Sequence, residues 1–513
     1  MNAVTNTTTK PKLNLRIMFS STLLRDAVVV ACAALLLAAA FPKIGAAWLV
    51  PFGTAALFWT WQGASWKRAL LLGWIFGIIF FALDFAWVGH TVARYIGVFG
   101  PYLAFGPALI EAPFIAIAGA LGALAYARMR PDVAPLGAAA AFTVAEWLRS
   151  IGVLAMPFDQ LGYTQAETPL RVLAAYAGTY GITFVLCVFG AYLADGVHRR
   201  KWRSFVIATV TLALATLAAW IAWPARSLAT PSIRVAAVQG NIAQSFKWNS
   251  LRLAVERYSL MTETASLRKP RLIVWPETVI TTDLNGDPAL LYRFENLARE
   301  AHATIVAGSL RWTRRRLYNA LYVFSPNGTY LTYDKRELVP FAEWFPGRRF
   351  LWWLPYVASL NGGLSAGRVN GVYPTTALPI APLICWESAF ADLAYTQVRA
   401  GAQLLVISTD DAWFGTTSGP YMHAQIAQLR AIESGAYVVR AAATGISGII
   451  APDGTWQRRS RLDSQTIVDG SVAPRAPTVF SRIGPLRIIA ALAAFYAILL
   501  VFGRTPGREQ PTP

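Results

Sequence analysis

The sequence predicts a membrane domain of about eight transmembrane α-helices combined with one α/β domain. The 513 residues are 55% hydrophobic and only 14% charged, and their mean hydropathy is +0.42. Ordinary soluble domains are about 25% charged, so this composition indicates a membrane protein. Two patterns support the fold class. Long apolar runs fill the first part of the chain, and short alternating strands and helices fill most of the rest.

Seven long apolar runs precede residue 224, and an eighth lies near the C-terminus. A helix that crosses the bilayer needs about 20 mostly apolar residues. The fifth run is short and rich in alanine, so its apolar signal is the weakest. The eight runs lie at residues 27–42, 44–63, 69–90, 101–127, 133–148, 171–194, 204–223 and 484–502.

Basic residues between these runs predict the orientation of the helices. Lys and Arg that flank a span stay mostly on the cytoplasmic side. If the N-terminus is cytoplasmic, most flanking basic residues, such as those at 199–203, fall in cytoplasmic segments. The opposite loops then hold only Lys43, Arg94, Arg149 and Arg171. We therefore expect both termini in the cytoplasm and the α/β domain on the other side of the membrane.

The alternative for the start of the chain is a cleaved signal peptide at residues 16–45, because basic residues precede an alanine-rich stretch there. Further spans follow at once and the apolar run is long, which favours a retained helix. The predicted parts are a transmembrane domain of about seven helices at 1–225, an α/β domain at 226–483, a transmembrane helix at 484–503 and a tail at 504–513.

Charge and cysteine usage limit the possible functions. The net charge of +19 is compatible with nucleic-acid binding only if the basic residues share one surface, whereas many of them lie in short loops between apolar runs. The three cysteines and four histidines are scattered, without the spacing of a disulfide framework or a zinc site. We expect no nucleic-acid partner, no metal and no cofactor.

The segment after residue 223 has the pattern of an α/β domain. Short runs rich in β-branched residues lie at 233–240, 271–276, 303–308 and 403–408. Helical patterns lie between them, at 251–267, 290–302 and 422–439. Alternating strands and helices predict a sheet covered by helices, and polar residues at strand ends are where a site is expected.

Three of these polar positions form a chemically complete set for acyl transfer. Cys385 ends an apolar run, Glu277 follows Trp-Pro, and Lys335 lies in a charged segment. A thiol attacks as its thiolate, and its ordinary pKa of about 8.5 leaves little thiolate at neutral pH, so a base such as Glu277 is needed. Lys335 would hold this carboxylate and stabilise the oxyanion that forms. Taken singly, the three residues are more often a core cysteine, a helix-start carboxylate and a solvated lysine.

Several motifs resemble apolipoprotein N-acyltransferases, which are membrane members of the nitrilase superfamily. The likeness covers nearly the whole chain, and shorter motifs at 146–150, 161–165 and 238–248 also resemble the family. The main motifs are Trp-Pro-Glu-Thr at 275–278, Tyr-Asp-Lys-Arg-Glu-Leu-Val-Pro-Phe at 333–341, Cys-Trp-Glu at 385–387 and Asp-Ala-Trp-Phe-Gly at 411–415.

The resemblance implies a nitrilase-like α-β-β-α sandwich in the periplasm, anchored in a bacterial inner membrane. It also implies a two-step reaction in which Cys385 takes an acyl chain from a phospholipid as a thioester. The α-amino group of a diacylglyceryl-modified cysteine at an apolipoprotein's N-terminus then accepts the chain. In this family pattern Cys385 is the nucleophile, Glu277 the general base and Lys335 the electrostatic stabiliser. Nothing in the sequence indicates oligomerisation, so we expect a monomer.

The resemblance assigns supporting or substrate-binding positions as well. Glu343 matches a carboxylate beside the lysine, and Glu387 matches a further functional position. The family motifs also contain Trp248, Trp386 and Trp413.

Departures from the family pattern leave the three central residues intact. Asp410 stands where asparagine is common, Trp386 stands where tyrosine is frequent, and the segment 442–444 lacks an asparagine. Two alternatives remain. One is a membrane-anchored amidase that passes the acyl group to water, and the other is a lipid-binding or transport protein without catalysis.

Overall fold

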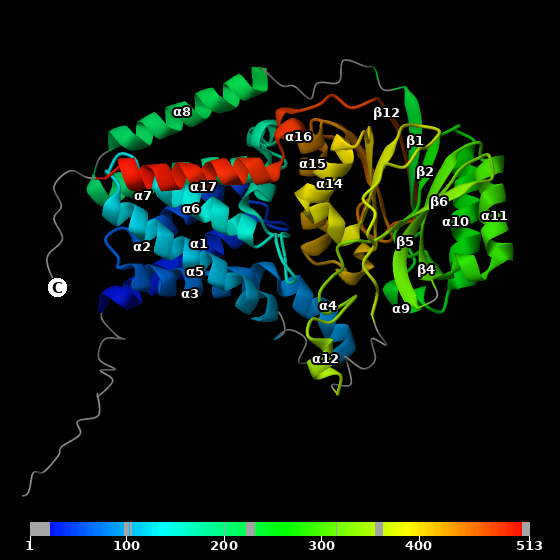
Figure 1. Ribbon diagram of the computed structural model, residues 1–513, viewed down its shortest axis with the longest axis horizontal. Coiled ribbons are helices and arrows are strands. Elements are labelled where there is room, and N and C mark those ends of the chain that lie inside the picture. The colour runs from blue at the N-terminus through cyan, green and yellow to red at the C-terminus, as the bar shows by residue number, and fades with distance from the viewer. Residues whose placement is uncertain are drawn as a thin grey trace, which may run out of the picture.

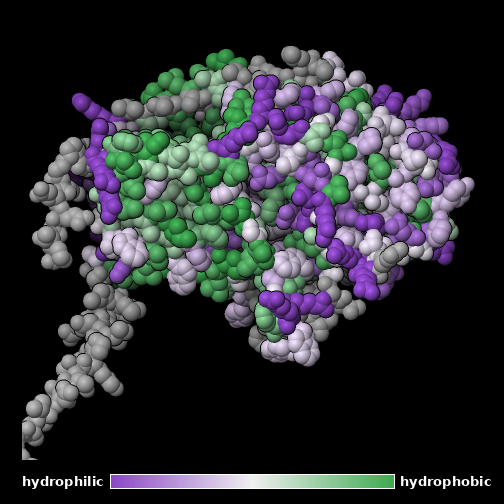
Figure 2. All heavy atoms as spheres, in the orientation of Figure 1, coloured by the Kyte–Doolittle hydropathy of each residue, from purple (hydrophilic) through white to green (hydrophobic). Residues whose placement is uncertain are grey.

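The computed structural model describes residues 21–96, 102, 105–200, 202–221, 230, 232–313, 315–353 and 363–504. It consists of a helical half and an α/β half, which lie side by side (Figure 1). Hydrophobic residues cover most of the visible face of the helical half, whereas hydrophilic residues are more frequent over the α/β half (Figure 2). The predicted combination of several apolar helices with an α/β domain is confirmed.

Each of the eight predicted apolar runs contains a helix. Six helices of the described chain are long and apolar enough to cross a membrane, whereas α2 and α6 have 12 and 15 residues. The helices are α1 (Ser21–Ala40), α2 (Val50–Trp61), α3 (Trp66–Asp84), α5 (Phe105–Arg128), α6 (Ala134–Leu148), α7 (Ala174–Arg199), α8 (Trp202–Ile221) and α17 (Pro485–Phe502). The exact domain boundaries and the number of membrane crossings stay predictions.

The run at 69–90, which the sequence predicts as one helix, is divided in the structure. Helix α3 ends at Asp84, Phe85 has non-helical backbone angles (φ −86°, ψ 14°), and a separate helix α4 (Ala86–Ile96) follows. Helix α4 extends to the α/β half (Figure 1), where the Thr91 hydroxyl donates to the carbonyl oxygen of Trp413 at 2.9 Å. The apolar pattern of the sequence contains no information about this long-range contact, so it predicted one continuous helix.

Small residues allow close packing in the helical half. A Cβ atom on Gly73 would lie 2.5 Å from the carbonyl oxygen of Ile115, and one on Gly119 would lie 2.4 Å from that of Ala69. Helices α3 and α5 therefore approach backbone to backbone, as is common where lipid removes the hydrophobic drive for association. Helix α8 instead exposes apolar side chains such as Leu214 (60% exposed).

The α/β half contains two sheets packed face to face. The first has the strand order β12-β1-β2-β4-β5-β6, with β3 paired to β4, and the second has the order β11-β10-β9-β8-β7. The strands are β1 (Ile233–Gln239), β2 (Leu272–Val274), β3 (Ile280–Asp283), β4 (Thr304–Thr313), β5 (Arg316–Phe324), β6 (Tyr330–Asp334), β7 (Ile380–Ile384), β8 (Leu404–Thr409), β9 (Tyr437–Ala442), β10 (Gly448–Ile450), β11 (Trp456–Arg459) and β12 (Thr466–Val472).

Helices cover the outer faces of both sheets. Helices α10 (Leu251–Ser266) and α11 (Pro288–Glu300) pack on the first sheet through Tyr258 and Phe294, while α14 (Ala391–Arg399) and α15 (Gly419–Ser434) pack on the second. Buried residues such as Val274 and Val406 fill the space between the sheets. The result is the expected α-β-β-α sandwich.

The second sheet's helices also rest on the helical half. The Thr179 amide and hydroxyl of α7 donate to Glu433 Oε1 of α15 at 2.8 and 2.7 Å. Gly178 has φ +64°, and a Cβ there would lie 2.3 Å from the Phe480 ring of α16 (Val479–Ile483). These contacts fix the α/β half on the membrane helices.

Candidate active site

Glu277 and Lys335 lie together in a buried ion cluster, and each follows a strand of the first sheet. Glu277 follows β2, Lys335 follows β6, and Lys335 Nζ is 3.0 Å from Glu277 Oε1. The same Nζ lies 2.8 Å from Glu343 Oε1. Both Lys335 and Glu277 are buried, with 1% and 5% of their surface exposed. One ammonium group therefore joins two of the predicted carboxylates.

The Glu277 carboxylate is held by donors on both oxygens. Besides Lys335, Asn319 Nδ2 donates to Oε1 at 2.6 Å, and the Asp410 amide donates to Oε2 at 2.9 Å. Burial alone would raise the Glu277 pKa, but Lys335, Lys247 and the hydrogen bonds outweigh it and lower the pKa below its ordinary value. Glu277 is therefore an ionised carboxylate at neutral pH.

A glycine allows the Glu277 loop to lie against the sheet. A Cβ on Gly308 in β4 would lie 2.4 Å from both the Pro276 carbonyl oxygen and the Thr278 amide nitrogen. Thr278 itself has φ +48°, in the left-handed region. This tight backbone fixes where the carboxylate points.

Lys335 is a permanent cation in this setting. Burial opposes its charge, but the carboxylates of Glu277 and Glu343 raise its pKa well above the ordinary value. Glu343 is anchored in turn, since its Oε2 accepts from the Val339 amide at 2.8 Å. The cluster can stabilise negative charge without gaining or losing a proton.

Cys385 stands at the turn that leaves β7. It is partly exposed, has φ +50°, and begins a 3-10 turn over Cys385–Ala389. Burial of the sulfur and the charge of Glu277 raise the pKa of the thiol well above its ordinary value, and Lys335 opposes this effect. The resting thiol is therefore protonated, and Glu277 is a carboxylate ready to accept a proton.

Hydrogen bonds hold the Cys385 turn from behind. Its carbonyl oxygen accepts from the Ser388 hydroxyl at 2.9 Å and lies 3.1 Å from His423 Nε2. His423 Nδ1 is 2.9 Å from Asp411 Oδ1, and Arg440 pairs with the other Asp411 oxygen at 2.7 Å. Burial and Arg440 lower the His423 pKa, so the imidazole is neutral. The network is a support for the turn.

Glu387 clamps the Lys335 and Cys385 segments together. Its Oε1 accepts from the Arg336 amide at 2.6 Å and the Tyr333 hydroxyl at 2.9 Å, while its Oε2 accepts from the Ile384 amide at 2.7 Å. Burial raises the Glu387 pKa to about 7 against these hydrogen bonds. The side chain is fully buried, so its place is structural support rather than contact with a substrate.

The three predicted tryptophans occupy different surroundings. Trp248 is 54% exposed and follows α9 (Gln244–Lys247). Trp386 is buried and stacks on Phe158 of the helical half at 5.3 Å between centroids. Trp413 is partly exposed and carries the carbonyl that Thr91 contacts. Only Trp248 and Trp413 therefore present surface to a substrate.

Two partners of Glu277 are absent from the sequence prediction of the site. Asn319 lies in the middle of β5, where nothing in the sequence distinguishes it from a packing residue. Lys247 Nζ lies 2.5 Å from Asp410 Oδ2 and 3.5 Å from the Glu277 carbonyl oxygen. Lys247 lies in the family-like motif at 238–248, and Asp410 is a departure from the family pattern. These two positions were the sequence features that could have indicated the contact.

Comparison with known proteins decides the family. The carbon-nitrogen hydrolase family model matches residues 234–474, and the model of the apolipoprotein N-acyltransferase N-terminal domain matches residues 33–192. The apolipoprotein N-acyltransferase of Rhodopseudomonas palustris is 32% identical over 505 residues, covering 90% of this chain and 92% of that protein. That of Methylococcus capsulatus is 32% identical over 464 residues, covering 86% and 89%.

The chain belongs to the apolipoprotein N-acyltransferase family. The two matches divide as the fold does: the N-terminal model begins within α1 and ends within α7, and the hydrolase model covers the two sheets. As a family member the protein is an acyltransferase of the inner membrane, and the resemblance read from the sequence is confirmed.

Proposed function

We propose that this protein transfers one acyl chain from a phospholipid to the α-amino group of a diacylglyceryl-modified cysteine at an apolipoprotein's N-terminus. The observation that carries the proposal is the partly exposed residue Cys385, whose thiol interacts electrostatically with the buried Glu277–Lys335 pair, on a domain fixed to apolar helices. The printed name of the relatives supports the apolipoprotein as acceptor. A lipid donor fits a site tethered to the membrane, because acyl chains avoid water.

In the first step, Glu277 takes the proton of the Cys385 thiol as the sulfur attacks the ester carbonyl of the phospholipid. A carbon–sulfur bond forms, and the charge of Lys335 stabilises the oxyanion. The ester carbon–oxygen bond then breaks, and Glu277 returns the proton to the oxygen of the departing lysophospholipid. The product is a thioester on Cys385.

In the second step, the acceptor's amino group replaces the sulfur. Glu277 takes one proton from the ammonium and passes it to solvent, and the neutral amine attacks the thioester carbonyl. The carbon–nitrogen bond forms and the carbon–sulfur bond breaks. The amine's second proton passes through Glu277 to the sulfur, which restores the thiol.

The other residues position these groups. Asn319 and Glu343 fix Lys335 and Glu277, and Glu387 holds the turn of Cys385. In this proposal the exposed Trp248 and the partly exposed Trp413 contact lipid or peptide, and the buried Trp386 supports Cys385 through its stack on Phe158.

The proposed topology has both termini in the cytoplasm and the domain at 226–483 in the periplasm, between a transmembrane domain at 1–225 and a single span at 484–503. Contacts at the end of α17 support it, since the Arg130 amide donates to the Gly503 carbonyl oxygen at 2.5 Å. The basic residues Arg128, Arg130 and Arg504 thus gather at one end of the bundle, as expected on a cytoplasmic side. We propose that a monomer suffices.

The test of this function is formation of a new amide. The full-length protein in phospholipid vesicles is given a synthetic lipopeptide with a diacylglyceryl-cysteine and a free N-terminus. We expect the peptide to gain one acyl group that resists hydroxylamine, with one lysophospholipid formed per product. An N-acetylated peptide is the control and gains nothing. Hydrolysis of a small amide without acylated peptide would instead support the amidase alternative, and phospholipid binding without any covalent product would support the non-catalytic alternative.

A further inference from the structure

Four arginines gather where the α/β half meets the start of α17. Arg475, in the segment after β12, donates to the Val398 carbonyl oxygen at 3.4 Å and to the Ser481 hydroxyl at 3.5 Å. Val398 and Ser481 directly precede Arg399 and Arg482 in the sequence, so Arg475 lies between these two arginines. Arg487, in the first turns of α17, donates to the Ile483 carbonyl oxygen at 3.5 Å. We call Arg399, Arg475, Arg482 and Arg487 the arginine cluster.

The charge of the arginine cluster is uncompensated. Within the described ranges of the chain, none of its four members has an ion pair, and the hydrogen-bond acceptors of Arg475 and Arg487 are neutral. Arg475 is partly buried, and burial together with the charges of Arg399 and Arg482 lowers its pKa. Like charges held this close repel one another, which an anion between them would relieve.

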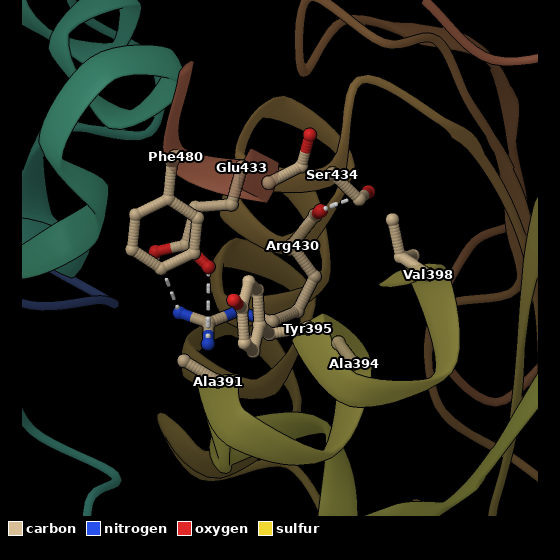
Figure 3. A pocket seen from close by; sticks show the side chains of 9 residues that line it. Ala391, Ala394, Tyr395, Val398, Arg430, Glu433, Ser434 and Phe480 are labelled. Atoms are coloured by element: carbon tan, nitrogen blue, oxygen red, sulfur yellow. Dashed lines mark hydrogen bonds and ion pairs between the residues drawn. The ribbon is translucent and has the colours of Figure 1, made fainter. Parts of the chain in front are cut away.

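A nearby arginine shows the contrast. Arg430 of α15 is fully buried and pairs with Glu433 at 3.1 Å. Both line a small pocket together with Tyr395, Ser434 and Phe480 (Figure 3). The chain thus neutralises the arginine inside the domain but not the cluster on the surface beside it.

The position of the arginine cluster fits a lipid headgroup. It surrounds the link between α16 and α17, at the junction of the two halves (Figure 1). Exposed apolar side chains lie among the arginines, namely Val479 and Ile483 (37% exposed each) and Leu486 (61%). The Tyr395 hydroxyl also reaches the Ile483 carbonyl oxygen at 3.5 Å, and tyrosine is enriched at membrane interfaces. Basic residues are usually scarce next to the non-cytoplasmic end of a span. The presence of four arginines there therefore calls for a different explanation, such as a bound anion.

We propose that the arginine cluster binds the phosphate of an anionic phospholipid in the leaflet next to the α/β half, with the acyl chains along the start of α17. Guanidinium groups match phosphate oxygens with paired N–H donors, and basic pockets beside transmembrane helices hold anionic headgroups. This site is separate from Cys385 and holds a lipid that is not consumed. It rests on the proposed topology but not on the proposed reaction.

Native mass spectrometry of the full-length protein tests the site. The protein is titrated with phosphatidylglycerol or with phosphatidylcholine of the same acyl chains, and lipid retention is compared with that of the double variant Arg399→Gln/Arg482→Gln. Both side chains are exposed, so the fold should be kept. We expect selective retention of one phosphatidylglycerol, weakened about 30-fold in the variant. The matched control is Arg293→Gln/Arg459→Gln, which removes two exposed arginines far from the spans and should retain the lipid as the parent does.

Three results would overturn the lipid site. These are equal retention of the two lipids, equal retention by variant and parent, and displacement of the lipid by millimolar inorganic phosphate, which would make it a site for free phosphate. Thioester formation on Cys385 is measured in the same samples. We expect it unchanged in the double variant, so a failure of the acyl-transfer proposal is visible separately from a failure of the lipid site.

Discussion

Among the residues that the structure describes, two buried clusters each have one cation between two carboxylates, and one such cluster lies in each half. In the α/β half, Lys335 lies between Glu277 and Glu343. In the helical half, Arg149 after α6 pairs with Glu111 of α5 and with Asp159. The composition is nearly the same, but the surroundings differ.

The two clusters differ in how completely their oxygens are bonded. Glu277 and Glu343 accept hydrogen bonds on every carboxylate oxygen. Among the described residues, Glu111 Oε1 and Asp159 Oδ2 have no hydrogen-bond partner. The Arg149 guanidinium also lies over the Phe81 ring at 4.3 Å, a contact that suits a planar cation. The first cluster is a rigid electrostatic centre beside a thiol, and the second fastens helices together.

The helical cluster is connected to the Cys385 turn through aromatic packing. Phe158, next to Asp159, stacks on Trp386 at 5.3 Å and lies 5.6 Å from the His423 ring. Trp386 follows Cys385 directly, and His423 contacts the Cys385 carbonyl oxygen. The comparison teaches that similar ion triplets can differ in role: we propose that the triplet of the α/β half acts in the reaction, whereas the triplet of the helical half positions helices.

Removing the lysine should have the largest effect. We expect Lys335→Met to lower kcat/KM by about 10³-fold or more, since the oxyanion loses its cation. The two carboxylates left behind also repel each other, which costs about 3–5 kcal/mol of stability. Lipopeptide acylation and thermal unfolding measure the two effects.

The double variant Lys335→Met/Glu343→Gln separates chemistry from folding. It removes the surplus charge, so we expect most of the stability to return while activity stays lost. Recovery of acylation in this variant would show that Lys335 acts only in folding.

Replacing the base should change two thiol reactions in opposite directions. In Glu277→Gln, acyl transfer should fall by about 10²–10⁴-fold, since the proton acceptor is lost. The same change removes the negative charge that raises the Cys385 pKa and leaves Lys335 in place, so the thiol pKa falls. Iodoacetamide should then alkylate Cys385 faster at pH 8 in the variant than in the parent, while the two converge at higher pH. A slower alkylation at pH 8 would contradict the assigned electrostatics.

Breaking the helical cluster should mainly lower the stability of the fold. We expect Arg149→Gln to cost about 3–5 kcal/mol of unfolding free energy, because two buried carboxylates lose their partner. Arg149→Lys should restore only part of the lost stability. The guanidinium group donates to Glu111 and Asp159 from two different nitrogen atoms, and a single ammonium group cannot reproduce this geometry. Thermal unfolding in detergent checks both values, with exposed Arg252→Gln as control. A variant as stable as the parent would remove the distinction drawn between the clusters.

The departure at Asp410 should have the smallest effect. Its backbone amide, not its side chain, donates to Glu277, and Asp410→Asn keeps that amide. We expect kcat/KM to change by less than about tenfold, with the loss arising from the weaker contact to Lys247. A larger drop would mean that the Asp410 charge belongs to the reaction.

The sequence predicts well what depends on local pattern. The apolar runs predicted the positions of eight helices, and Glu277 and Cys385 follow β2 and β7, which are the strand ends where polar site residues were expected. The sequence did not indicate Asn319, because its position beside Lys335 depends on how β5 and β6 pair. The Lys335 amide donates to the Asn319 carbonyl oxygen at 2.8 Å, and this register cannot be read from either segment alone.

Contacts between the helical half and the α/β half could not be predicted from the sequence either. The Phe158–Trp386 stack and the break at Phe85 depend on how the α/β half rests on the helices. The partners of Glu111 likewise come from separate segments, so the sequence did not reveal the helical cluster. Such contacts follow from packing in three dimensions rather than from periodicity.

Intact-mass measurement of the protein after incubation with phospholipid alone tests the central claim most directly. We predict a mass increase of one acyl chain, located on Cys385, removed by hydroxylamine and absent in Cys385→Ala. An unchanged mass under conditions that support lipopeptide acylation, or an increase that persists in Cys385→Ala, would contradict the account.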